Sequence, residues 1–150
     1  DDMDIHHDWI QFEITETVAT EYNVGLGMVI DGFMAAGVRL CLDDFGSGYA
    51  NLNTVMRLPF SAIKIDRTLL FDICNDKKRA MFYQSIVETF HRMGYSIVTE
   101  GVETEEEMSL LSSWGVDMIQ GYYYGKPMPE TECLRYIRRM HSAKEDYGKS

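Results

Sequence analysis

The segment DDFGSGY at residues 43–49 directly follows the apolar run VRLCL at residues 38–42, and these two stretches decide the fold. The alternation of the run and its β-branched start predict a buried strand. Two adjacent carboxylates at the end of such a strand are unfavourable unless a positive charge lies beside them. Gly46 and Gly48 allow a sharp turn or a close approach of the backbone to a ligand. A metal ion or a phosphate-bearing substrate explains both features, and a solvated Asp-Asp turn is the alternative.

An apolar run followed by a helical stretch recurs along the whole chain. Strand-like runs fall at residues 9–13, 38–42, 62–66, 95–100 and 116–120. Helices are predicted at residues 24–36, 52–57, 78–93, 104–114 and from 129 onward. Thr104 and Glu107 match a capping box, and glycine follows several of the helices. This alternation indicates an α/β protein with about five βα units and a parallel sheet.

Composition and charge narrow the function classes. The 150 residues suffice for one compact domain, and no apolar run is long enough to span a membrane. The formal net charge of −10, without a basic stripe, excludes a surface for nucleic-acid polymers. It does not exclude a phosphate ligand because bound divalent cations can invert the local charge.

The cysteines and histidines predict no zinc site. Cys41, Cys74 and Cys133 are odd in number and widely spaced, which fits neither a zinc motif nor a disulfide framework. The four histidines form no metal-binding pattern either. Reduced thiols are typical of a cytosolic protein, so a cytoplasmic location is expected.

Polar residues lie at or just past the end of every predicted strand. They are Glu13, Asp43, Asp44, Lys64, Glu100 and Gln120. Right-handed crossovers place the carboxyl ends of parallel strands on one side of a sheet. Enzymes built on β/α barrels or open parallel sheets keep their active sites on this side. We therefore expect these residues to form one site.

The residue types in this expected site favour phosphodiester chemistry. Four carboxylates on one rim repel each other unless hard cations lie between them, and oxygen ligands alone favour Mg²⁺ or Mn²⁺ over zinc. Asp43 and Asp44 in tandem can serve two neighbouring ions. Lys64 can orient a water or stabilise charge on phosphate, and Glu100 can bind metal or accept a proton. The alternative for each residue is a simple strand-end salt bridge, for example between Lys64 and Asp44.

Five motifs in this order and spacing resemble the EAL-domain family from about Trp9 to Met140. The motifs are EITE at 13–16, DDFGSGY at 43–49, KIDR at 64–67, EGVET at 100–104 and QGY at 120–122, followed by Lys126-Pro127. The family consists of bacterial cyclic di-GMP phosphodiesterases built on a modified TIM barrel. Its members use two Mg²⁺ or Mn²⁺ ions to hydrolyse the cyclic dinucleotide to linear pGpG.

The resemblance implies a role for each residue at the strand ends. Glu13 and Asp43 would hold the first metal, and Asp43, Asp44 and Glu100 the second. Lys64 would contact the attacking water, with Glu100 as the general base.

Three further residues complete the implied site. Glu103 and Gln120 would complete the pocket near the metals and the substrate. Glu16 would organise the loop at residues 45–52, which couples dimerisation to metal binding in the family.

The resemblance also implies domain boundaries. Residues 1–8 are read as an acidic lead-in, 9–141 as the C-terminal part of an EAL domain, and 142–150 as a polar tail. The Glu-Ala-Leu strand and the next strand, whose Asn binds the first metal, are expected before residue 1. A partial barrel with an incomplete first metal site therefore predicts an inactive fragment of an active parent. A degenerate module that binds cyclic di-GMP or a protein partner is the alternative.

The partial barrel also leads to an expectation about the oligomeric state. Two open sheet edges predict a homodimer or larger assembly, with residues near the strand at 9–13 in or beside a contact. An N-terminal GGDEF or sensory domain is expected in the parent, which could be tethered to a membrane.

Overall fold

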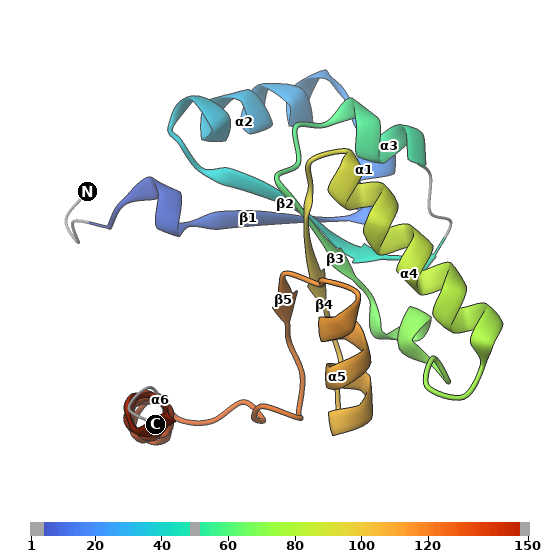
Figure 1. Cartoon of the computed structure of the whole chain (residues 1–150). Helices are drawn as coiled ribbons and strands as arrows, with labels where there is room; N and C mark the ends of the chain where they lie inside the picture. The colour runs from blue at the N-terminus through green and yellow to red at the C-terminus, as the bar shows by residue number, and fades with distance from the viewer. Residues whose placement is uncertain (1–4, 49–51, 148–150) are drawn as a thin grey trace.

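Five parallel strands form one sheet in the computed structural model, which describes residues 5–48 and 52–147. The strands are β1 (Gln11–Thr15), β2 (Arg39–Phe45), β3 (Ala62–Ile65), β4 (Ser96–Thr99) and β5 (Met118–Ile119). Their order in the sheet is β1-β2-β3-β4-β5, so every strand pairs with its neighbours in sequence (Figure 1). This confirms the predicted α/β class and its five parallel strands, and the winding is that of a barrel segment.

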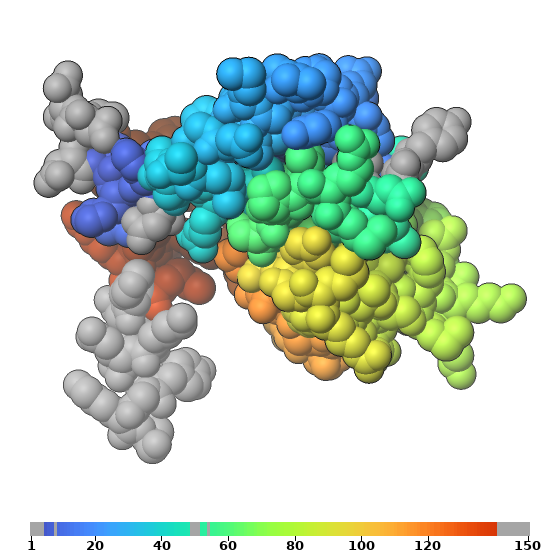
Figure 2. Space-filling view, turned by 90° about the horizontal axis from the view of Figure 1, so that it is seen from above, coloured from blue at the N-terminus to red at the C-terminus, as the bar shows by residue number. Residues whose placement is uncertain are grey.

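Six α-helices accompany the described strands. They are α1 (Glu16–Thr20), α2 (Val24–Ala35), α3 (Leu52–Arg57), α4 (Lys77–Arg92), α5 (Glu105–Ser113) and α6 (Glu130–Tyr147), with short 3-10 helices η1 (His7–Trp9) and η2 (Arg67–Leu70). Figure 2 shows α2, α3 and α4 side by side on one face of the molecule. Among the described residues, no helix combines the length and the apolar composition that a bilayer crossing requires.

The apolar core lies between the sheet and the helices that cover it. In β3, Ile63 and Ile65 are fully buried in this core, together with Phe90 of α4. The hydroxyl groups of Tyr83 in α4 and Thr99 in β4 share a buried hydrogen bond of 2.7 Å. Because successive side chains of a strand point to opposite faces, the side chain of Lys64 projects away from this core.

Local sequence signals account for most of the helix ends. The predicted capping box is present, because Glu107 N–H donates to Thr104 Oγ1 while the Glu107 carboxylate accepts from Thr104 N–H. Gly37, Gly94 and Gly115 follow the ends of α2, α4 and α5 with positive φ angles. A left-handed residue at this position allows the last carbonyl groups of a helix to be bonded.

Some boundaries differ from the sequence predictions. The sequence pattern predicts a strand that begins at Trp9, but this residue lies in η1, where its N–H donates to His6 O. Helix α6 continues to Tyr147, through most of the predicted tail, because residues 142–147 include the good helix formers Ala, Lys and Glu. Helices α1 and η2 were not predicted. Residues 1–4, 49–51 and 148–150, which belong to the predicted lead-in, loop and tail, lie outside the described residues.

Helix α6 stands apart from the sheet, to which an extended segment joins it (Figure 1). Tyr136 of this helix donates a hydrogen bond of 2.6 Å to the carbonyl of Tyr124. Its side chains Leu134, Ile137 and Met140 are exposed. Within the described chain, β1 pairs only with β2 and β5 only with β4, so both sheet edges are open.

Candidate active site at the carboxyl ends of the strands

A break in the strand pairing brings both aspartates of the central motif to the rim of the sheet. The register between β2 and β3 shifts between Leu42 and Phe45, and Asp44 adopts a φ of 58°. Aspartate tolerates this left-handed conformation better than most residues. Asp44 N–H donates to Asp43 Oδ1 at 3.0 Å, and Phe45 then returns to the core. The sequence pattern predicts that this strand ends at residue 42, whereas β2 continues through both aspartates to Phe45.

Lys64 is the centre of an ion-pair network at this rim. Its ammonium nitrogen lies 2.9 Å from Glu13 Oε2, 2.9 Å from Asp43 Oδ1 and 2.8 Å from Glu100 Oε1. The side chain is only 10% exposed. Burial alone would lower the pKa of Lys64, but the hydrogen bonds to Glu100, Asp43 and Glu13 outweigh burial and raise it. Lys64 is therefore a permanent cation shared by residues of three other segments.

A three-carboxylate cluster overlaps this network. Oxygen atoms of Asp43, Asp44 and Glu100 all lie within 4.8 Å of one another. Burial, followed by repulsion from Asp43 and Asp66, raises the pKa of Asp44. The raised pKa of Asp44 therefore reflects burial first and the neighbouring carboxylates second. Three convergent oxygen ligands suit a hard divalent cation, so the donor set fits the predicted metal.

The thiol of Cys41 lies on the same face of the sheet as this cluster but does not belong to the donor set. Cys41 precedes Asp43 by two residues in β2 and is fully buried. Burial and then the Glu13 carboxylate raise the pKa of the thiol to about 12. It therefore stays protonated near neutral pH.

Glu16 connects the start of α1 to the turn after the aspartates. Its side chain is buried, and Oε2 accepts a hydrogen bond of 3.2 Å from Gly46 N–H. Gly46 has a φ of 93°, and a Cβ there would overlap the side chain of Leu69. Among the described residues, the buried Glu16 Oε1 has no partner. Glu16 thus contacts the predicted loop at its first turn, while residues 49–51 of that loop lie outside the described chain.

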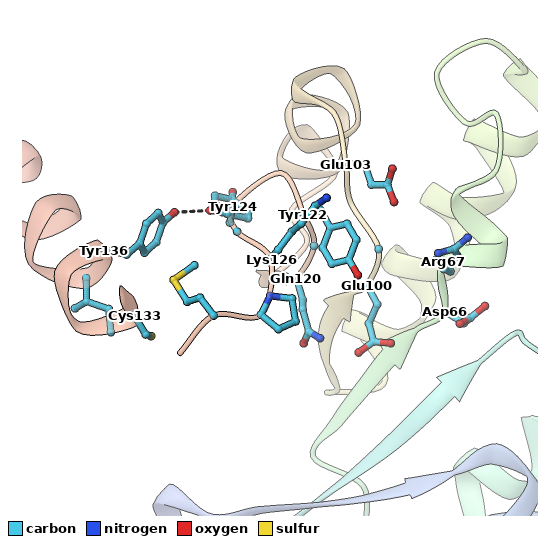
Figure 3. A pocket seen from close by; sticks show the side chains of 16 residues that line it. Asp66, Arg67, Glu100, Glu103, Gln120, Tyr122, Tyr124, Lys126, Cys133 and Tyr136 are labelled. Carbon is cyan, nitrogen blue, oxygen red and sulfur yellow. Dashed lines mark hydrogen bonds between the residues drawn. The ribbon is translucent and has the colours of Figure 1, made fainter. Parts of the chain in front are cut away.

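A cavity of about 610 Å³ opens beside the cluster. Its lining includes Asp66, Arg67, Glu100, Glu103, Gln120, Tyr122, Tyr124, Lys126, Cys133 and Tyr136. Figure 3 shows Gln120 and Glu100 on neighbouring loops at the strand ends, with Glu103 farther along toward Arg67 and α6 on the opposite side. The structure therefore gathers Glu100, Glu103 and Gln120 around one cavity.

Sequence reasoning missed several residues that line this cavity. Tyr122 stands within a quoted motif, and Lys126 lies 5.3 Å from the centre of its ring. The run of three tyrosines at residues 122–124 was an available signal for an aromatic wall. Tyr136 and Cys133 come from α6, and their placement depends on the path of the chain after β5.

Comparison with known proteins identifies the family. The family model of the EAL domain matches residues 2–127. The chain belongs to the EAL domain family. The EAL match spans all of the strands and the three-carboxylate cluster.

Two similar proteins of Pseudomonas aeruginosa agree with this membership. The chain is 35% identical over 125 residues to the bifunctional diguanylate cyclase/cyclic di-GMP phosphodiesterase MucR of Pseudomonas aeruginosa, covering 83% of this chain and 18% of MucR. It is also 35% identical over 127 residues to the cyclic di-GMP phosphodiesterase RocR of the same organism, covering 85% of this chain and 32% of RocR. The EAL chain thus spans less than a third of the length of each relative.

A solved structure that binds cyclic di-GMP has the same fold. The manganese and cyclic di-GMP complex of BlrP1 from Klebsiella pneumoniae superposes with a TM-score of 0.76 at 32% identity. The superposition covers 82% of this chain and 31% of the BlrP1 chain.

Proposed function

We propose that this chain is the C-terminal part of an EAL-domain phosphodiesterase and that the complete protein hydrolyses cyclic di-GMP to linear pGpG. The observation that carries the proposal is the cluster of Asp43, Asp44 and Glu100, whose oxygen atoms lie within 4.8 Å of one another. Glu100 also lines the adjacent cavity, so a ligand in the cavity would meet the cluster. The names of RocR and of the BlrP1 complex support this substrate for their own proteins.

The carboxylates would hold two divalent cations, Mg²⁺ or Mn²⁺. Glu13 and Asp43 would serve the first ion, and Asp43, Asp44 and Glu100 the second. All of these ligands are oxygen atoms, which both cations prefer. When bound, such a pair of ions supplies charge stabilisation at the phosphate and an activated water. The oxygens proposed for the second ion all lie within 4.8 Å of one another.

Two of the remaining site residues would act on the reacting groups, and a third would support the metal ligands. Lys64 would orient the attacking water and stabilise the charge that develops on the phosphate. Glu100 would accept the proton of that water. Glu16 would hold the turn that positions Asp44, through its bond to Gly46 N–H.

The cavity would take the nucleotide. Its tyrosine side chains offer flat faces for stacking on a guanine base, and Lys126 adds a positive charge. Glu103 and Gln120 would complete the pocket with hydrogen-bonding groups. The acidic chain can accept an anionic substrate here because the bound cations would reverse the local charge.

Hydrolysis of cyclic di-GMP by the longer protein that contains this chain tests the proposal. We expect turnover with Mn²⁺ or Mg²⁺ and its loss in chelator. Asp43→Asn and Asp44→Asn should abolish turnover and weaken metal binding, because a neutral amide is a poor ligand. Asp31→Asn, in an exposed turn of α2, is the matched control and should leave the rate unchanged.

Two outcomes would redirect the assignment. Full activity and metal affinity in Asp44→Asn would overturn the two-metal site. Tight binding of cyclic di-GMP without hydrolysis would favour the second candidate, a degenerate module that binds the nucleotide or a partner protein.

We also propose a homo-oligomer. Two large apolar side chains are exposed near the open β1 edge, Phe12 in the strand and Trp9 just before it. Leu52 of α3 and Phe82 of α4 are exposed as well. Exposed apolar groups of this size are typical of contact surfaces. Light scattering at micromolar concentration should give a dimer or larger species, and a monomer with protected β1 amides would contradict this. A cytoplasmic parent with a GGDEF or sensory domain remains part of the proposal.

A further inference from the structure

The central position of β3 in the sheet brings Lys64 within reach of carboxylates from both neighbouring strands. Strand β3 lies between β2 and β4, so its side chains reach both the Asp43 segment and the residue after β4. The ammonium also reaches across β2 to Glu13 on β1. All three separations are between 2.8 and 2.9 Å, which is the range of strong charge-assisted hydrogen bonds.

These carboxylates depend on a cation for their arrangement. Without the ammonium, Glu13, Asp43 and Glu100 would face one another with Asp44 beside them. Asp43, Asp44 and Glu100 are partly buried, whereas the Glu13 side chain is 44% exposed. Repulsion between like charges is poorly screened where the groups are partly buried. Removing one partner of a buried ion pair leaves an uncompensated charge and destabilises the fold. Lys64 therefore stabilises the folded arrangement of these carboxylates in the absence of a metal.

The same oxygen-bearing groups would also serve a divalent cation. Asp43 and Glu100 belong both to the Lys64 network and to the three-carboxylate cluster with Asp44. Asp43 Oδ1 already accepts from Lys64 and from Asp44 N–H. A divalent cation and an ammonium that share two carboxylates repel each other strongly at this range.

We infer that Lys64, in addition to its role toward the water, is a resident counterion that holds Glu13, Asp43 and Glu100 until a divalent cation binds, and that its ion pairs and that cation compete. The inference rests on the metal site of the proposed function. Its consequence is that the ammonium loosens from Asp43 and Glu100 when the cation is bound. The freed ammonium then becomes available to the phosphate or the water, so one residue serves both states of the site.

The test compares the 150-residue chain with two variants, Lys64→Met and Lys77→Met. Both substitutions remove one positive charge, but Lys77 is exposed at the start of α4. In chelator, Lys64→Met should lower the midpoint of thermal unfolding by about 5 °C, whereas Lys77→Met should stay within about 1 °C of the wild type. Millimolar Mn²⁺ should remove most of the deficit of Lys64→Met.

Titration calorimetry with Mn²⁺ alone supplies the second readout. Because the competing ammonium is gone, Lys64→Met should bind Mn²⁺ at least about threefold more tightly than the wild type. If Lys64→Met does not fold in chelator, its folding in Mn²⁺ is the expected result. The double variant Glu13→Gln/Lys64→Met, which removes one carboxylate as well, should then recover stability without metal.

Three results would overturn the inference. One is equal stability of Lys64→Met and the wild type in chelator. Another is unchanged or weaker Mn²⁺ affinity in Lys64→Met, which would leave the metal site of the proposed function intact. The third is an absence of Mn²⁺ binding in both proteins, which would remove the metal site of this chain as well.

Discussion

Asp117 and Asp44 lie at opposite ends of the same parallel sheet, and their carboxylates meet opposite environments. Asp117 Oδ2 accepts from Ile97 N–H at 2.7 Å and lies 2.8 Å from His91 Nε2. Burial alone would raise the pKa of Asp117, but these two partners lower it. At Asp44, burial and neighbouring carboxylates raise the pKa. The Asp117 carboxylate thus has bonding partners at the amino end, whereas three carboxylates share the single cation Lys64 at the carboxyl end, an arrangement that suits a cationic ligand.

The largest expected effect concerns the carboxyl end and is the loss of hydrolysis in the 150-residue chain alone. The Glu and Asn that the family resemblance assigns to the first metal are not among its residues. We expect little or no hydrolysis of cyclic di-GMP by this chain, far below one turnover per second. A coupled assay for pGpG in Mn²⁺ measures it, and enzyme-like turnover would show that the rim is complete as it stands.

A substitution at the carboxyl end should separate binding from chemistry. In the longer protein, Glu100→Gln should lower kcat by about a hundredfold or more, because a general base acts in the transition state. The affinity for cyclic di-GMP should change much less. Asp117→Asn is the control and should keep kcat near the wild-type value. A large loss of affinity with unchanged kcat would assign Glu100 to substrate binding instead.

The stability of the two aspartate variants should differ in direction. Asp117→Asn should lower the free energy of unfolding by about 1 kcal/mol, because a charged acceptor for Ile97 N–H and His91 is lost. Asp44→Asn should leave it unchanged or raise it in chelator, since it removes a repelled charge and asparagine tolerates positive φ. Urea unfolding of the 150-residue chain measures both. The comparison fails if Asp44→Asn is the more destabilised variant.

The smallest effect is a pH dependence at the amino end. The folded pKa of Asp117 is lowered, so its contribution is fully present above the ordinary value of 3.8 and is lost as pH falls through the folded value. The stability difference between wild type and Asp117→Asn should therefore shrink as the solution becomes more acidic than about pH 4. Unfolding midpoints between pH 3 and pH 7, roughly, would reveal the trend. A difference that grows toward low pH would contradict the assigned sign.

The sequence predicted the sheet and most of its site because those signals are local. Strand alternation, capping residues and a polar residue at each strand end are all readable in one dimension. The sequence left open a simple salt bridge between Lys64 and Asp44 as the alternative, whereas the structure pairs Lys64 with Glu13, Asp43 and Glu100. The difference arises from the register shift after Leu42, which no sequence pattern announces. Asp117 was also missed, because its partners come from α4 and β4.

The consecutive strand order has a consequence for how this region is made. Each strand pairs with the next one in sequence, so the sheet can be extended one strand at a time as the chain leaves the ribosome. Glu13 and Asp43 emerge first, Lys64 follows, and Glu100 comes last. The cation therefore arrives before the final carboxylate, and repulsion at the rim is already reduced when β4 docks.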